Sequence, residues 1–267
     1  MLCKSFPLDQ KSVSRLSSKG LSPDVLRKQI DDGLDFTLEL WRAQGVELVK
    51  KQGYYFFKTK FTPVNEAEFC IVDIETNGSK LEKHQIIELA AIKVKNGVII
   101  DRFETLVKCE TINEHITQIT GIKAEDTQNA PELKEVLYSF KTFLGDAIFV
   151  AHDVKFDYKF ISGSMLKIGL EPLYNRSLCS LSLAERTIVS YRYALSYLND
   201  TFHFNSNATH HRAMSDVLTT FGLFKMSLDN CKENVNNVED LIKFSREAPR
   251  LKRPKFDPLK KEEEISE

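Results

Sequence analysis

The chain has 267 residues, of which 42% are hydrophobic and 28% charged, and its formal net charge is −1. This length allows one sizeable core and a small second unit, and the composition is typical of a water-soluble globular protein. The near-neutral total excludes a strongly cationic body, although a local basic stripe for nucleic acid is compatible with it. The first residues lack the apolar stretch of a signal peptide, and no run of about 18 apolar residues predicts a membrane span.

Cysteines are few and scattered. They stand at positions 3, 70, 109, 179 and 231, and no two of them form a C-x-x-C pair. This spacing does not predict a zinc site, and it suits reduced thiols. We therefore expect a cytoplasmic protein.

The first 60 residues predict a small N-terminal unit. Residues 1–20 are polar and rich in Ser and Lys, so we expect a loose arm there. A first helix is expected to begin at Ser22-Pro23, a second to cover residues 36–43, and residues 46–60 predict a hairpin. Two helices followed by a two-stranded wing indicate a winged-helix-like unit.

The predicted hairpin turns near Gly53 and is rich in lysines and aromatic residues. It carries Lys50, Lys51, Lys58, Lys60, Tyr54 and Tyr55. Such side chains can bind nucleic acid, because bases stack on aromatic rings and lysines attract phosphates. The simpler interpretation is a solvated hairpin that packs on the main domain or on a partner, and both interpretations stay open.

After a linker at residues 61–67, a main domain is expected over residues 68–232. Apolar runs predict three strands, which are joined in part by a tight Asn96-Gly97 turn. Further along, apolar spacing predicts a helix, a short buried strand and four more helices. The strands are expected at residues 68–74, 86–94, 98–107 and 147–151, and the helices at residues 131–144, 153–168, 181–189, 191–198 and 211–229. This order predicts an α/β domain with a mixed sheet covered by helices.

Residues 233–267 are expected to form a C-terminal helix and a charged tail. From about residue 246 the segment has too few apolar residues to pack, so we expect it to be disordered. Its apolar anchors Leu251, Phe256 and Leu259 can fold onto a partner such as a polymerase. The tail can equally be a solubilising end.

Four acidic residues and one histidine lie in three separate segments. Residues 69–78 contain Asp73 and Glu75, residues 148–158 contain Asp157, and residues 210–216 contain His211 and Asp216. Each has an ordinary interpretation by itself: a solvated strand face, an acid at a helix start, or a structural histidine.

The expected elements allow these side chains to converge. Asp73 and Glu75 are two apart in a strand and therefore share a face. Asp157 lies in the first turns of a helix that follows a strand, where His152 and Asp153 are expected to cap or orient the helix. His211 and Asp216 are five apart, so they can meet only if His211 precedes the helix that holds Asp216. The adjacent His210 is the competing candidate.

Carboxylates suit Mg²⁺ and Mn²⁺, which prefer oxygen ligands. Two such ions about 3.5–4 Å apart can promote cleavage of a phosphodiester. A histidine with a pKa near 6.5 can accept a proton from water at neutral pH.

The three segments resemble the motifs of the DEDDh 3′–5′ exonucleases, the superfamily of the proofreading epsilon subunit of bacterial DNA polymerase III. Residues 72–78 (VDIETNG) are similar to the first motif, residues 151–160 (AHDVKFDYKF) to the second, and residues 211–216 (HRAMSD) to the third. Residues 86–92 (IIELAAI), and residues 119–122 (ITGI) with Ala130-Pro131, also resemble recurrent family segments.

This resemblance covers roughly residues 66–230 and implies an RNase H-like fold with a five-stranded mixed sheet. It implies that four acids bind two Mg²⁺ or Mn²⁺ ions and that His211 is the general base. It further implies that Thr76 and Asn77 contact the terminal nucleotide. Phe156, expected to face inward with Phe160 and Ile161, is assigned to substrate binding as well. Two residues depart from the family pattern, Asp153 in place of Asn and Asn77 in place of Thr. The implied metal ligands are Asp73, Glu75, Asp157 and Asp216.

We therefore expect a metal-dependent 3′–5′ exonuclease that acts on single-stranded DNA ends and releases nucleoside 5′-monophosphates, in replication proofreading or repair. The expected partners are a DNA 3′ end and the catalytic subunit of a DNA polymerase III. The alternatives are an RNA-trimming exonuclease of the same superfamily and a catalytically idle binding module.

Overall fold

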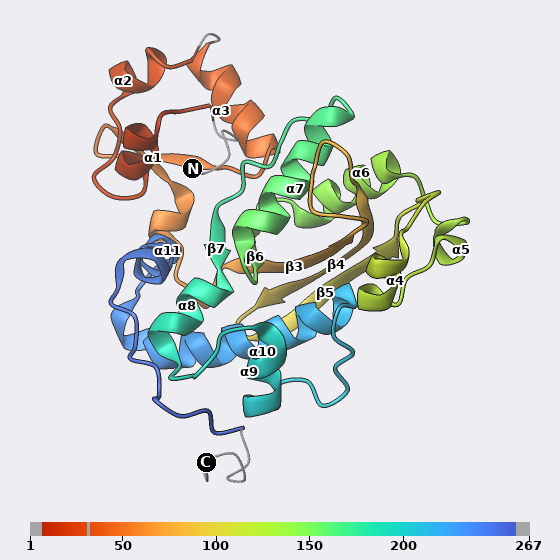
Figure 1. Ribbon diagram of the computed structural model, residues 1–267. Helices are drawn as coiled ribbons and strands as arrows, with labels where there is room; N and C mark the ends of the chain where they lie inside the picture. Colours follow the sequence, from red (N-terminus) through yellow and green to blue (C-terminus); the bar gives the residue numbers. More distant parts are fainter. Residues whose placement is uncertain (1–6, 31–32, 260–267) are drawn as a thin grey trace.

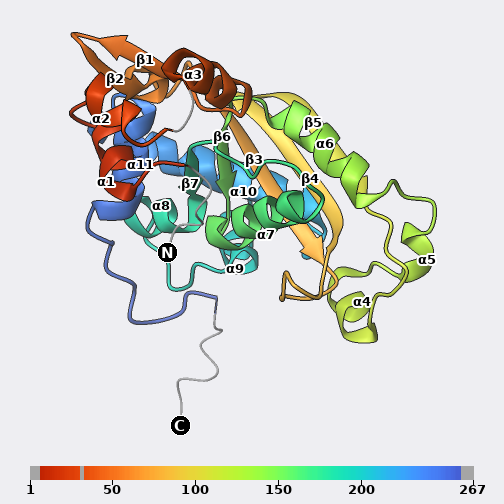
Figure 2. The same ribbon diagram turned by 90° about the horizontal axis from the view of Figure 1, so that it is seen from above.

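The computed structural model describes residues 7–30 and 33–259. Its centre is a mixed five-stranded sheet with helices on both faces (Figures 1 and 2). The strand order is β5-β4-β3-β6-β7; β3, β4 and β5 are antiparallel, whereas β6 and β7 run parallel to β3. The strands are β3 Glu68–Thr76, β4 Ile86–Lys95, β5 Val98–Leu106, β6 Ile148–Ala151 and β7 Ser177–Cys179. The predicted mixed sheet flanked by helices is confirmed.

Alternation along β3 builds the two halves of the core. Phe69 and Ile71 face α10 (Ala213–Cys231), and α8 (Ser180–Thr187) lies beside that helix. Cys70 and Val72 face the opposite side, where α6 (Leu133–Leu144) and α7 (Val154–Lys167) pack. Successive side chains of a strand point to opposite faces, so covering both faces makes nearly the whole strand apolar.

Most predicted elements of this domain exist, and the differences are local. Helix α9 covers Leu195–Phe202 instead of residues 191–198, because Tyr193 is buried in the preceding loop and its hydroxyl donates to the carbonyl of Ile188. Two helices in the segment after β5 were missed, α4 (Glu114–Thr120) and α5 (Ala124–Thr127). The side chain of Asn113 caps α4, which ends at Gly121 with a φ of 73°.

The N-terminal unit contains α1 (Gln10–Leu16), α2 (Pro23–Arg27), α3 (Leu34–Ala43) and the hairpin β1 (Leu48–Lys51) and β2 (Tyr54–Phe57). The expected loose arm is wrong for residues 7–20, because Asp9 caps α1 and Leu16 is fully buried in the core of the unit. The expectation for residues 1–6 lies outside the described residues. The hairpin and the Ser22 cap agree with the prediction.

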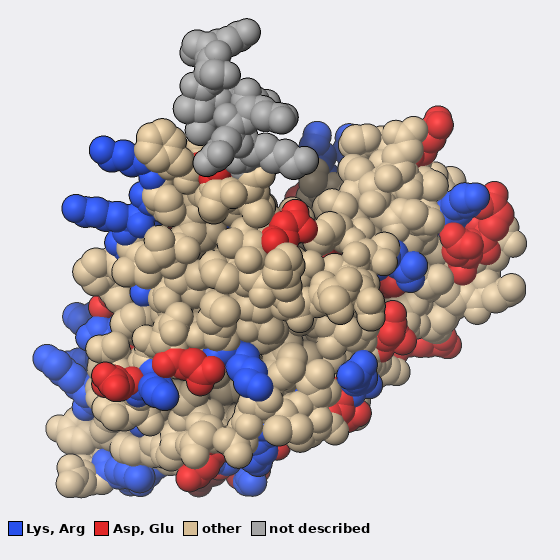
Figure 3. Space-filling model, turned by 90° about the horizontal axis from the view of Figure 1, so that it is seen from below, with Lys and Arg blue, Asp and Glu red and all other residues tan. Residues whose placement is uncertain are grey.

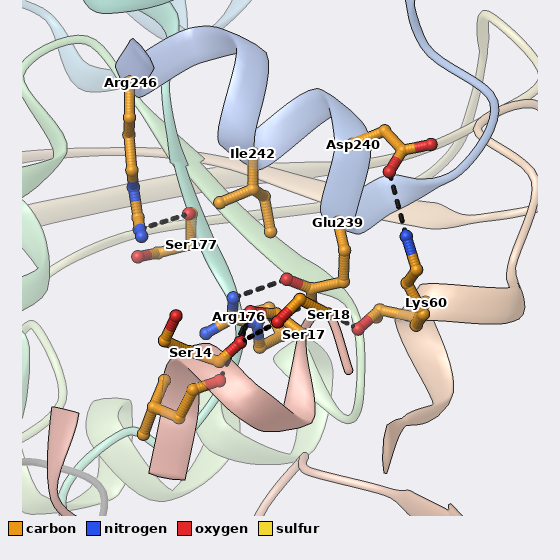
Figure 4. A network of polar contacts seen from close by, with 12 residues as sticks. Ser14, Ser17, Ser18, Lys60, Arg176, Ser177, Glu239, Asp240, Ile242 and Arg246 are labelled. Atoms are coloured by element: carbon orange, nitrogen blue, oxygen red, sulfur yellow. Dashed lines mark hydrogen bonds and ion pairs between the residues drawn. The ribbon is translucent and has the colours of Figure 1, made fainter. Parts of the chain in front are cut away.

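Helix α11 (Val238–Glu247) connects this unit to the main domain (Figure 4). Glu239 accepts two hydrogen bonds of 2.7 Å from Arg176, next to β7, and one of 2.6 Å from Thr59, just after β2. Lys60 bonds Asp240 at 3.1 Å. The predicted linker also packs, because Ala67 is buried.

The charged tail is not disordered from residue 246 up to residue 257. Arg186 of α8 donates to the carbonyls of Ala248 and Arg246, and the backbone N–H of Leu251 donates to the carbonyl of Glu185. The hydroxyl of Tyr197 on α9 donates to Asp257. The apolar side chains Leu251 and Phe256 of this segment are exposed, and polar contacts hold the segment instead, which a composition argument does not detect.

Among the helices of residues 7–30 and 33–259, none has both the length and the apolar character needed to cross a bilayer.

Candidate metal centre

The C-terminal end of β3 holds the first two acids. Asp73 and Glu75 lie on the same side of the sheet as Phe69 and Ile71, the side that α10 covers. Glu75 pairs with Glu88 of β4, and the register shifts between Glu75 and Thr76. A β-bulge of this kind often re-aims side chains next to an active site. The strand thus brings both carboxylates to one edge of the sheet, as expected.

The start of α10 brings Asp216 and His211 to the same edge. His211 has a φ of 60° and precedes the helix, and its backbone N–H donates to Asp216 Oδ2 at 3.1 Å. Ligand atoms of Glu75, His211 and Asp216 lie within 4.8 Å of one another. The competing His210 is also close, with its Nδ1 3.9 Å from Asp216 Oδ1. Of the two histidines, His211 is the one grouped with both carboxylates.

Asp157 approaches from the other layer. It lies in the first turn of α7 and is only 4% exposed. Burial raises the pKa of its carboxyl group to about 8, against the lowering effect of the nearby backbone groups of Asp157 itself and of Ile74, which lies between Asp73 and Glu75. The structure therefore brings together all four acids and the histidine of the three motifs.

The four carboxylates disfavour one another's charge. Burial, followed by repulsion from Asp157, Asp216 and Glu75, raises the pKa of Asp73 well above its usual range. Burial and then Asp216 raise the pKa of Glu75 to about 8. Burial also raises the pKa of Asp216, which the backbone N–H of His211 partly counteracts. Clustered acids of this kind need a cation to stay ionised, so the donor set fits a divalent metal with oxygen ligands.

Glu88 supports the centre and was missed as a functional residue. Its side chain is 2% exposed, accepts hydrogen bonds of 2.8 to 3.3 Å from Arg212, and accepts one of 2.9 Å from the backbone N–H of Ala213. It thereby fixes the first residues of α10, one turn before Asp216. The available signal was an ionisable residue inside the apolar run of residues 86–92.

The three predicted substrate contacts differ in their surroundings. Thr76 is 9% exposed at the strand end. The Asn77 amide donates to the carbonyl of Thr111 and accepts from the backbone N–H of Gln85, so it already holds two loops together. Phe156 does not face inward; it is 39% exposed. Asp157, Phe160 and Ile161 occupy the inward face of α7, and a residue one position before Asp157 is turned by about 100°.

His152 and Asp153 shape the start of α7 in different ways. The His152 ring lies between Ser180 Oγ, at 3.1 Å from Nδ1, and the carbonyl of Tyr193, at 2.9 Å from Nε2. It orients the junction, as expected. Asp153 stands at the cap position with a φ of 67°, but its side chain makes no capping hydrogen bond.

Comparison with known families identifies this arrangement. A family model described as an exonuclease, RNase T, matches residues 70–224. This range contains every residue of the cluster, from Asp73 to Asp216. The chain belongs to this exonuclease family. It is a DEDDh exonuclease, a metal-dependent phosphodiester hydrolase, because the matched segment holds the four acids and His211 in one cluster.

Relatives of this exonuclease include much longer polymerases. It is 36% identical over 188 residues to the DNA polymerase III PolC-type of Staphylococcus haemolyticus. The aligned region covers 69% of this chain and 13% of the relative. The Staphylococcus aureus protein of the same name is 35% identical over 179 residues, or 66% of this chain and 12% of the relative. The chain thus spans about an eighth of the length of these relatives.

Solved structures share the fold at low identity. Exonuclease X in complex with 5′ overhanging duplex DNA superposes with a TM-score of 0.52 and 23% identity, over 66% of this chain and 99% of that chain. Escherichia coli exonuclease I in complex with a dT13 oligonucleotide gives a TM-score of 0.57 and 15% identity, over 63% and 42% of the two chains. These similarities support the exonuclease fold.

Proposed function

We propose that this exonuclease removes nucleotides from the 3′ end of single-stranded DNA and releases nucleoside 5′-monophosphates. The observation that carries the proposal is the cluster of Glu75, His211 and Asp216, within 4.8 Å, beside Asp73 and the buried Asp157. The PolC-type relatives, which are DNA polymerases by name, favour DNA and a role in replication proofreading. On the same basis, the catalytic subunit of a DNA polymerase III is the expected partner.

In this proposal each residue of the cluster has a defined role. Asp73, Glu75, Asp157 and Asp216 hold two Mg²⁺ or Mn²⁺ ions. Such a pair, when bound, activates water and stabilises the departing oxygen. His211, exposed before α10, accepts the proton of the attacking water. Thr76 and Phe156, which directly adjoin Glu75 and Asp157 in the chain, contact the terminal nucleotide, and Asn77 holds the strand end in place.

The N-terminal unit is interpreted as winged-helix-like, and its chain order supports this. Between α1 and α2, Leu21 pairs with Tyr55 of the hairpin, which adds a third short strand to the wing. The helices α2 and α3 and the hairpin correspond to the predicted unit, whereas α1 and the pairing of Leu21 stand where a loose arm was expected. The boundaries at residues 60, 68 and 232, and the cytoplasmic location, stay predictions.

The decisive experiment compares histidine and aspartate variants on a 3′-labelled oligonucleotide with Mg²⁺ or Mn²⁺. Asp73→Ala and His211→Ala should each lower the cleavage rate by about 100-fold or more, because a ligand or the proton acceptor is lost. His210→Ala should retain most of the activity. Unchanged digestion by both the Asp73 and His211 variants would remove the proposal.

The two alternatives are separated by the same assay. Matched DNA and RNA oligomers should be degraded at different rates, with DNA faster; faster degradation of RNA would favour the trimming enzyme. The idle module predicts no metal binding at millimolar Mg²⁺ or Mn²⁺ in calorimetry. The complete set of four acids and a histidine argues against that alternative.

A further inference from the structure

Residues 248–257 form a strap that is fixed to α8, α9 and the loop between them. The carboxylate of Glu185 on α8 lies 3.0 Å from Arg250 Nε and 3.3 Å from Arg253 Nη2. At the far end of the strap, Asp257 bonds the hydroxyl of Tyr197 and lies 3.9 Å from Arg192 Nε. The strap therefore has a defined path over the surface, and its side chains have defined directions.

The strap reaches the metal centre through one loop. The Arg253 guanidinium lies over the Tyr193 ring, 5.1 Å from its centroid. The carbonyl of Tyr193 is 2.9 Å from the His152 ring, at the start of the helix that carries Asp157. The loop that holds Tyr193 also leads through α9 to His211. The segment from Tyr193 through α9 to His211, which the strap contacts at Tyr193 and Tyr197, thus links the strap to the metal centre.

The acidic side chains around the strap are buried, whereas the basic ones are exposed to solvent. The side chains of Glu185 and Asp257 are 7% and 6% exposed, whereas those of Arg192, Arg250 and Arg253 are 59%, 64% and 55% exposed. Lys252 and Lys255 are exposed as well. The acids lie beneath and the five cations face solvent, so the outward charge of the strap is positive although the chain as a whole has a net charge of −1.

Figure 3 views the molecule from the side on which the C-terminus lies. Lys and Arg are more frequent along the left edge of this view, and Asp and Glu are more frequent on the right. A positive stripe on an otherwise neutral protein attracts polyanions.

Aromatic rings accompany these cations. The guanidinium of Arg192 contacts the neighbouring rings of Tyr191 and Tyr197, 5.7 and 5.8 Å from their centroids. Phe256 on the strap is 77% exposed, more than any other large hydrophobic side chain of the described residues. Bases of a single strand stack on such rings while cations contact the phosphates, without need for a particular sequence.

We propose that the strap, with the loop around Tyr193, binds single-stranded DNA on the 5′ side of the nucleotides in the metal centre. This inference rests on the proposed function, and it adds a second contact that holds the substrate several nucleotides from the cleaved bond. Lys252 and Lys255 contact phosphates, and Phe256 stacks on a base. The strap also exposes Leu251 and Phe256, but its four exposed cations, Arg250, Lys252, Arg253 and Lys255, outnumber them, and this charge favours a polyanion over an apolar protein surface.

The test uses the full chain and two substrates of different length. The double variant Lys252→Ala/Lys255→Ala should hydrolyse the p-nitrophenyl ester of thymidine 5′-monophosphate at the wild-type rate, because this substrate fills only the metal centre. On a thymidine oligonucleotide of about 20 nucleotides, its KM should rise about tenfold, and the dependence of log KM on log salt should weaken by about one unit.

Further variants separate the contributions of charge and stacking. Phe256→Ala should raise KM for the oligonucleotide about threefold or more without changing the salt dependence. Lys252→Arg/Lys255→Arg should keep the wild-type KM, because it keeps both charges. Lys134→Ala, on α6 across the sheet, removes an equally exposed cation and should change neither substrate.

Each failure has its own signature. If the wild type cleaves neither substrate in Mg²⁺ or Mn²⁺, the proposed function fails first. If the wild type cleaves both and the strap variants match it on the oligonucleotide at every salt concentration, the strap does not bind DNA. Loss of polymerase co-purification in those same variants, with unchanged DNA kinetics, would also overturn the inference in favour of a protein partner.

Discussion

At the scale of single residues, Asp157 shows how the fold changes a side chain. Its pKa is raised to about 8 by burial, so between about pH 4 and pH 8 the folded, metal-free protein binds a proton that the unfolded chain has lost. The folded-state pKa lies above the unfolded value, and the free energy of unfolding therefore falls as pH rises through this window.

Asp157→Asn should consequently stabilise the metal-free protein more at pH 8 than at pH 5, by about 3–4 kcal/mol in the free energy of unfolding. With saturating Mg²⁺ or Mn²⁺ the variant should be less stable than the wild type, because the amide is a weaker metal ligand than the carboxylate. Urea titrations at both pH values, with EDTA or metal, measure the difference. An equal effect at the two pH values would contradict the raised pKa.

The sequence alone gave the identity of these acids, since residue types and strand alternation place Asp73 and Glu75 on one face. The sequence did not predict which side chains surround the cluster or which of them are exposed. Whether Asn77 is free for substrate depends on contacts to Thr111 and Gln85, which lie 34 and 8 residues away in the chain. The exposed position of Phe156 likewise follows from which face of α7 meets the sheet.

At the scale of elements, the start of α10 depends on a pair from another strand. In Arg212→Ala the carboxylate of Glu88, which is 2% exposed, keeps the hydrogen bond from the backbone N–H of Ala213 but loses its ion pair. The free energy of unfolding should fall by about 2–3 kcal/mol. The cleavage rate should also fall, because Asp216 lies one turn further along.

Arg212→Lys is the matched control and should retain most of both properties, since it keeps a cation near Glu88. Denaturant midpoints and single-turnover rates check the pair together. Full activity of Arg212→Ala would show that the ion pair between Arg212 and Glu88 does not position α10.

The same scale shows why some elements were predictable. Strands β4 and β5 followed from an Asn-Gly turn between apolar runs, and α10 from its apolar spacing. Strand β7 has only three residues, and its pairing with β6 is a long-range contact, so no local pattern marks it. The predicted position of α9, residues 191–198, was wrong because Tyr193 is buried in a loop by tertiary contacts, which local helical periodicity does not reveal.

At the scale of the whole molecule, Glu239 joins three parts of the chain: Thr59 beside the hairpin, Arg176 beside β7 and α11 itself (Figure 4). Glu239→Ala should lower the free energy of unfolding by about 3 kcal/mol, because Arg176 is largely buried and loses its partner. It should also make residues 58–67 accessible to proteases.

Asp240→Ala on the same helix is the control. It removes the partly exposed pair with Lys60 and one hydrogen bond from the Asn237 amide, so the loss should be about 1 kcal/mol. Thermal unfolding and limited proteolysis distinguish the two variants. Equal behaviour of the two would mean that the buried pair does not attach the N-terminal unit.

The sequence by itself determined the family, the five residues of the cluster and most of the sheet, because residue types, strand alternation and tight turns are local properties. Tertiary structure decided how the strap packs, how Glu88 holds the start of α10, and how Glu239 attaches the N-terminal unit. It also decided the raised pKa values of the clustered acids. Each of these depends on burial and on partners that are distant in the chain, such as Glu185 for Arg250 and Arg253. Composition suggests that a charged segment stays in water, but a buried carboxylate elsewhere in the fold can hold it in place.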